Sequence, residues 1–187
     1  MLPGRVFPSP PPTALSYDRL SPPVPEANVN ESILRAHLSR ALNWADAHVD
    51  FDTAVENMPA ELRGSKPERA PHTPWEILEH LRIAQEDILD FCRSGEYWER
   101  NWPDEYWPPT AAPPDDGAWA RSADAFRSDR EGLKRLTLDP SIELFAAIPH
   151  GTGQTYLREL LLVIDHNSYH LGQLVEVRRQ LGCWPPK

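Results

Sequence analysis

The sequence predicts an all-α protein, a four-helix bundle. Four long segments carry apolar residues at the i, i+3, i+4 spacing of a helix that buries one face. No segment shows the apolar–polar alternation of a half-buried strand, and irregular stretches rich in proline or glycine separate the four. Because helices without a sheet bury their apolar faces against one another, a bundle with long loops is the expected architecture.

The first predicted helix runs from about residue 28 to residue 58. Its apolar side chains recur at helical spacing, and Pro59 ends it. Asn28, with Glu31 three residues later, resembles a capping box, and Asn30 is an equally good N-cap. The apolar positions of this helix are Leu34, Leu38, Ala41, Leu42, Ala45 and Val49.

The second predicted helix has the clearest start in the chain. Thr73 is a good N-cap, Pro74 suits the first helical turn, and Glu76 completes a capping box. The helix is expected to end before Gly95. Its predicted buried stripe comprises Ile77, Leu81, Ala84, Ile88 and Phe91.

The third and fourth helices are predicted at residues 117–136, capped by Asp116, and at residues 155–181, with Gly182 as the C-terminal stop. The fourth is apolar over a wide arc, which indicates burial on two sides. Its main band comprises Leu160, Val163, Ile164, Leu171 and Leu174, and a second band comprises Leu157, Leu161 and Val175. A homodimer interface along this helix is the favoured explanation, and cover by the long loops of the same chain is the alternative.

The chain divides into residues 1–27, a proline-rich extended arm, and residues 28–187, the bundle. Eight prolines in the arm exclude a continuous helix or a central strand. The arm is either an unstructured tail or a segment that packs on a neighbouring subunit.

Composition narrows the class of partner. A net charge of −9 argues against nucleic acid and against an anionic membrane surface as partners. No apolar run is long enough to span a bilayer, and the first residues lack the apolar core of a signal peptide. Two cysteines, Cys92 and Cys183, fit a reducing compartment and indicate structural roles. A cytoplasmic protein with a small-molecule substrate is therefore expected.

A long connection at residues 96–116 contains five aromatic residues, so we expect it to be ordered against the bundle. One interpretation is that the segment covers an apolar edge of the core. The other is that some of its rings line a ligand pocket. The five are Tyr97, Trp98, Trp102, Tyr106 and Trp107.

Three histidines predict an open metal site. His80 lies within the buried stripe of the second helix, and His166 and His170 are four residues apart on the fourth, hence on one face. Three imidazoles without a fourth protein ligand leave a coordination position for water or substrate. Gln173 and Glu76 are candidates to orient a ligand. The competing interpretation is a buried histidine paired with backbone or carboxylate, plus a chance pair.

Other familiar metal and phosphate motifs are missing from the sequence. There are no paired Glu-x-x-His motifs of a ferritin-like di-iron centre, no HExxH zinc-protease motif and no glycine-rich phosphate loop.

Two segments resemble the DinB/YfiT-like superfamily. HTPWEILEHLRIAQEDILDF (72–91) resembles its second helix, and GQTYLRELLLVIDHNSYHLGQLVEVRRQLGCW (153–184) resembles its last, with a D-H-x-x-x-H-x-G-Q pattern. The resemblance covers roughly residues 28–184. It implies an up-down-down-up bundle, a frequent dimer, and one divalent metal ion, often nickel or zinc, held by His80, His166 and His170.

The resemblance also implies a choice of functions. The first hypothesis is a thiol-dependent S-transferase that uses a low-molecular-weight thiol and an electrophile, with Trp98, Trp102 or Trp107 holding an apolar substrate. The second is a metal-dependent hydrolase, for which His150 is a weak candidate as general base. The third is a non-catalytic metal-binding protein of the stress response.

Overall fold

The computed structural model describes residues 31–43, 45–93 and 95–186. The proline-rich arm predicted at residues 1–27 and the candidate caps Asn28 and Asn30 lie outside these residues. The described helices are α1 (Glu31–Ala41), α2 (Phe51–Val55), α3 (Pro74–Arg93), α4 (Ala118–Leu138) and α5 (Tyr156–Gln180), with short 3-10 turns η2 (Ala60–Leu62) and η3 (Asp104–Tyr106).

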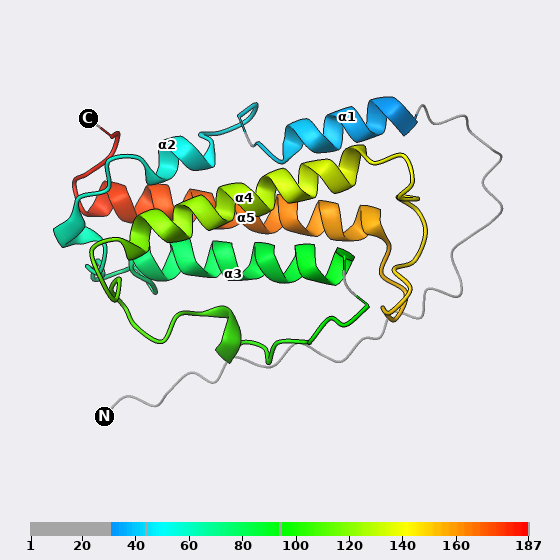
Figure 1. The fold of residues 1–187 in the computed structure, drawn as a ribbon. Helices are drawn as coiled ribbons and strands as arrows, with labels where there is room; N and C mark the ends of the chain where they lie inside the picture. Colours follow the sequence, from blue (N-terminus) through cyan, green and yellow to red (C-terminus); the bar gives the residue numbers. More distant parts are fainter. Residues whose placement is uncertain (1–30, 44, 94, 187) are drawn as a thin grey trace, which may run out of the picture. The chain divides into compact units, whose positions relative to one another are not determined.

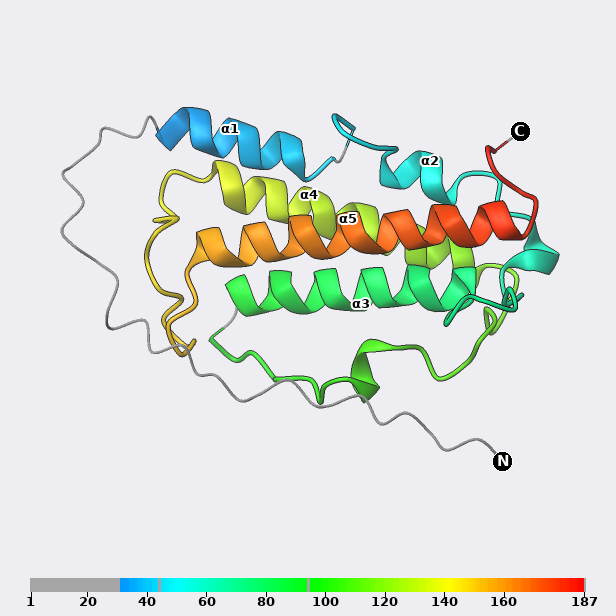
Figure 2. The same ribbon diagram turned by 180° about the vertical axis from the view of Figure 1, so that it is seen from behind.

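Four main helices pack together, which confirms the predicted all-α bundle. The α3 helix packs against both α4 and α5, and α1 packs against α4 and α5. Figure 1 and the reverse view in Figure 2 show α3 and α4 running in the same direction, with α1 and α5 opposed to them. This is the up-down-down-up order, and the long segment between α3 and α4 returns along the outer side of α3.

The caps that the sequence predicts for α3 and α5 are present. Thr73 and Glu76 bond reciprocally: the Thr73 N–H donates to Glu76 Oε2 at 2.7 Å, and the Glu76 N–H donates to Thr73 Oγ1 at 3.1 Å. The side chain of Thr155 accepts the N–H of Arg158 at 3.2 Å, which starts α5. These caps fix where the two helices that carry the histidines begin.

The prediction of one continuous helix over residues 28–58 is wrong. The structure has α1, then turns, then the short α2. Asp50 caps α2 by accepting the Thr53 N–H at 2.8 Å, and a side chain that binds local backbone favours a new helix start over continuation. Ala45 and Val49, expected on the buried stripe, are exposed.

The predicted Asp116 cap of α4 is also wrong. Gly117 is the N-cap residue and makes no side-chain capping bond, and Asp115 accepts the Gly117 N–H at 2.9 Å. Asp115 lies one residue before the predicted cap. The Asx turn that its side chain makes ends at Gly117, where α4 starts. The α4 helix ends at Leu138, close to residue 136, the end predicted for the third helix.

The wide apolar arc of α5 has two surroundings. Leu160, Val163, Leu171 and Leu174 are fully buried, and Val175 is also in the core. Leu161 and Tyr169 face outward, with 52% and 64% of their surfaces exposed. No helix in the described part of the chain is both long and apolar enough to cross a membrane.

Candidate metal centre

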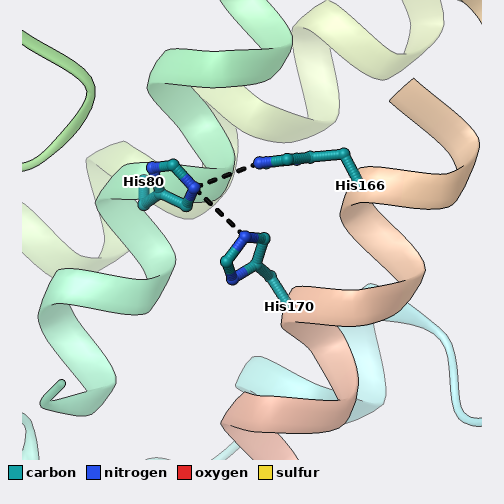
Figure 3. A group of neighbouring side chains, drawn as sticks. All are labelled: His80, His166 and His170. Atoms are coloured by element: carbon teal, nitrogen blue, oxygen red, sulfur yellow. Dashed lines mark hydrogen bonds between the residues drawn. The ribbon is translucent and has the colours of Figure 1, made fainter. Parts of the chain in front are cut away.

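The three predicted ligands lie together between α3 and α5 (Figure 3). His80 Nε2 is 3.1 Å from the Nε2 atoms of His166 and of His170. One nitrogen from each residue falls within 4.8 Å of the other two. His80 and His170 are buried, and His166 is half-buried. The structure therefore brings His166 and His170 next to His80, although they follow it by 86 and 90 residues in the sequence.

The hydrogen bonds of the Nδ1 atoms determine which nitrogens face the centre. His80 Nδ1 is 2.8 Å from the backbone carbonyl oxygen of Tyr106, and His170 Nδ1 is 2.8 Å from Gln173 Oε1. A backbone carbonyl only accepts, so the Nδ1 of His80 carries the hydrogen. The proposed orienting role of Gln173 is consistent with this contact.

His166 is oriented by a relay that crosses three helices. Its Nδ1 donates to Asn167 Oδ1 at 3.1 Å, and Asn167 Nδ2 donates to Gln85 Oε1 at 3.0 Å. Gln85 Nε2 in turn donates to the backbone carbonyl of Phe126 at 2.7 Å. The last acceptor is a carbonyl, so each amide in the relay has one assignable orientation.

Each ring thus has a hydrogen on Nδ1 and a lone pair on Nε2, and the three lone pairs converge. Burial lowers the pKa of His80 to about 4, and burial together with the neighbouring His166 and His80 lowers the pKa of His170 to about 3. Burial also lowers the pKa of His166. Three neutral imidazoles with converging Nε2 atoms match the donor set of a borderline first-row divalent ion.

Sequence inspection missed the Gln85–Asn167 pair, although a signal was present. Both side chains are fully buried. Asn167 stands four residues after Val163 and four before Leu171, inside the main apolar band of α5, and Gln85 directly follows Ala84 of the α3 stripe. A polar residue at a core position requires a partner, so these two positions could have been paired from the pattern.

The chain matches the family model of the DinB superfamily over residues 43–174, more than half of its length. It belongs to the DinB superfamily. The match includes α3, α4 and all three histidines and begins after α1, whereas the resemblance noted from the sequence extended over residues 28–184. No curated protein and no solved structure matches the chain.

In this DinB domain the aromatic residues between α3 and α4 have three different environments. Trp107 stacks on the His80 ring with centroids 3.9 Å apart and on His72 at 3.8 Å, so its indole lies between two imidazoles. Trp98 and Trp102 are exposed, at 69% and 68%. Tyr97 and Tyr106 bond to Asp87.

A cavity of about 470 Å³ is lined by the C-terminal half of α3, which includes Asp87, and by the first turns of α5. Tyr106, whose carbonyl holds His80, lines it, as does Leu162, one helical turn before His166. His150 also lines it, and its Nε2 is 2.8 Å from the Phe91 carbonyl, so its Nδ1 has the lone pair. The volume is within the range of small-molecule sites.

Two other expectations have clear outcomes. Glu76 does not bond to His80; it completes the capping box and lies 3.9 Å from Nδ1 of His72. Both cysteines are free thiols, and burial, then Glu159, raises the pKa of Cys92 to about 12. A thiol with that pKa is a poor nucleophile at neutral pH, which agrees with a structural role.

Proposed function

We propose that this DinB protein is a divalent-metal-dependent enzyme whose metal ligands are Nε2 of His80, His166 and His170. The observation that supports it is the common orientation of the three rings: each Nδ1 contacts an oxygen acceptor, and each Nε2 faces the other two. No other group of three or more histidine, cysteine or carboxylate side chains with ligand spacing occurs among the described residues. Zinc or nickel suits such a set of imidazoles.

The surroundings of the three rings favour a Lewis-acid role. A divalent ion there would lower the pKa of a thiol or water molecule at its open position. The acceptors behind the ligands are a backbone carbonyl and two side-chain amides, none of them a carboxylate. Neutral acceptors orient the rings without cancelling positive charge at the centre, so the site stabilises an anionic nucleophile.

The reaction that we propose first forms a bond between the sulfur of a small thiol and an electrophilic carbon. The thiol proton passes to solvent, and a halide leaves the carbon or an epoxide C–O bond opens. This reaction needs no protein base once the thiol is ionised. Among the described residues, the Nε2 atoms of the three histidines contact one another and bond to no other acid or base side chain. Cys92 is unsuitable as the nucleophile, because it is buried with a raised pKa. The cavity that Tyr106 and Leu162 line has room for the thiol or for the electrophile, although none of the three histidines is part of its lining.

Hydrolysis is the second candidate, and His150 is the observation that favours it. Its Nδ1 lone pair is available because Nε2 binds the Phe91 carbonyl, and its ring lines the same cavity as Tyr106. A neutral imidazole with a free lone pair can act as general base for water. In this reaction the role of His150 is to accept a proton.

A paired activity test separates these functions. Protein loaded with zinc or nickel is assayed with glutathione plus 1-chloro-2,4-dinitrobenzene or an epoxide, and with p-nitrophenyl acetate without thiol. We expect thiol consumption above the buffer rate in the first assay, lost in His166→Ala and retained in His150→Ala. Ester hydrolysis that depends on His150 would instead establish the hydrolase, and turnover in neither assay would contradict an enzymatic role for this centre.

We also propose a homodimer that uses the outer face of α5. Leu161 and Tyr169 are exposed on this helix, and large exposed apolar side chains that recur along one helix are typical of an interface. We expect the mass of a dimer by light scattering at micromolar concentration and that of a monomer for Leu161→Glu/Tyr169→Glu. A monomeric parent protein would contradict the proposal.

A further inference from the structure

We infer that Asp87 is a positioning residue for His80, acting through the hydroxyl groups of Tyr97 and Tyr106. The inference rests on the proposed function of the three histidines. It concerns the segment from Tyr97 to Trp107, here called the aromatic segment, which runs along the outer side of α3 (Figures 1 and 2).

Asp87 holds this segment through both of its carboxylate oxygens. Tyr97 donates its hydroxyl to Asp87 Oδ1 at 3.0 Å, and Tyr106 donates its hydroxyl to Asp87 Oδ2 at 2.7 Å. Arg100 Nε lies 3.5 Å from Oδ1 of the same carboxylate. Asp87 is buried, and a buried carboxylate needs donors at both oxygens. One side chain of α3 therefore fixes the segment near both of its ends.

The two phenols are suited to this task at neutral pH. Burial, together with the Asp87 charge, raises the pKa of Tyr97 to about 12, and the pKa of Tyr106 is raised further for the same reasons. Both hydroxyls consequently keep their protons and remain donors.

The fixed segment places a backbone carbonyl and an aromatic ring against His80. The carbonyl of Tyr106 accepts the Nδ1–H of His80, and the next residue, Trp107, stacks on the same ring at an interplanar angle of 2°. Asp87 follows His80 by seven residues, so both side chains are on one face of α3 about two turns apart. The segment thus joins one anchor on α3 to the imidazole on the same helix face.

These two contacts restrict the tautomer and the rotation of the His80 imidazole. The Tyr106 carbonyl selects the tautomer that leaves the lone pair on Nε2, and the Trp107 face limits rotation of the imidazole. Loss of the anchor would let the carbonyl move away, and the ring could then take either tautomer. This also explains why a long loop with exposed Trp98 and Trp102 is ordered against α3 near the histidines.

The test compares the parent protein with Tyr97→Phe/Tyr106→Phe, which keeps both rings and removes only the hydroxyls. Ser122→Ala is the matched control, because the Ser122 hydroxyl donates to another buried carboxylate of α3, Glu79, on the side that faces α4. The first readout is the ¹⁵N NMR spectrum of the His80 ring in metal-free protein, and the second is zinc affinity by chelator competition.

We expect the His80 ring to carry its hydrogen on Nδ1 in the parent protein and in Ser122→Ala, and to show mixed tautomers in the double variant. Zinc affinity should fall about tenfold in the double variant, in the range seen for loss of an outer-shell partner, and change less than about twofold in the control. An unchanged tautomer in the double variant, or an equal loss of affinity in both variants, would overturn the inference. If the parent protein binds no zinc, the proposed function fails, and the NMR comparison still decides the role of Asp87.

Discussion

Replacement of His166 by alanine is expected to abolish binding of a divalent ion while leaving the bundle folded. The substitution removes one of three converging Nε2 atoms, and His166 is half-buried, so the lost packing is limited. Loss of a direct metal ligand should lower the metal affinity more than loss of the hydrogen-bond partner behind it, which costs about 10–100-fold. Competition with a coloured chelator measures the affinity, and circular dichroism measures the helical content.

His150→Ala is the matched control for this result. It deletes an imidazole that lines the neighbouring cavity and lies outside the cluster of three. We expect its zinc affinity to equal that of the parent protein. Equal affinities for the parent and His166→Ala would show that the metal, if bound, has other ligands.

Substitution of Gln85 by leucine is expected to weaken metal binding about 10–100-fold without touching a ligand. Gln85 fixes the orientation of Asn167, and Asn167 accepts the Nδ1–H of His166. Leucine also leaves the buried Asn167 Nδ2 without its acceptor, Gln85 Oε1, so we expect a loss of about 1–3 kcal/mol in the free energy of unfolding. Zinc competition and urea denaturation measure the two effects separately.

Thr137→Val is the control for the stability effect. Thr137 is fully buried and donates to the Leu133 carbonyl within α4, on a helix that carries none of the three histidines. We expect it to lower the free energy of unfolding and to keep the parent zinc affinity. If Gln85→Leu also kept the parent affinity, the relay would serve only to stabilise the bundle.

The cluster of three histidines could be predicted from the sequence because each histidine follows a helical rule. His80 falls within the apolar stripe of α3, and His166 and His170 are one turn apart on α5. The helix starts at Thr73 and Thr155 could be predicted for a similar reason, since a cap depends on residues only three apart. These features are local, so their signals survive in a single sequence.

The acceptors behind the ligands are harder to predict, because they are set by the tertiary structure. A backbone carbonyl such as that of Tyr106 has no sequence signature, and its approach to His80 depends on Asp87 and on the path of a long loop. The break between α1 and α2 was missed because the periodic apolar pattern continues through it, while the local cap at Asp50 favours a new start.

We propose that three converging Nε2 atoms hold one divalent ion, and elemental analysis of the untagged protein decides whether they do. Purified protein is stripped with a chelator, reloaded separately with zinc, nickel and cobalt, and freed of unbound metal before analysis. The predicted result is about one ion per chain, with a cobalt absorption spectrum of a site with imidazole ligands. Failure to retain any of the three ions would contradict it and would leave the His80, His166 and His170 cluster as a structural feature of the bundle.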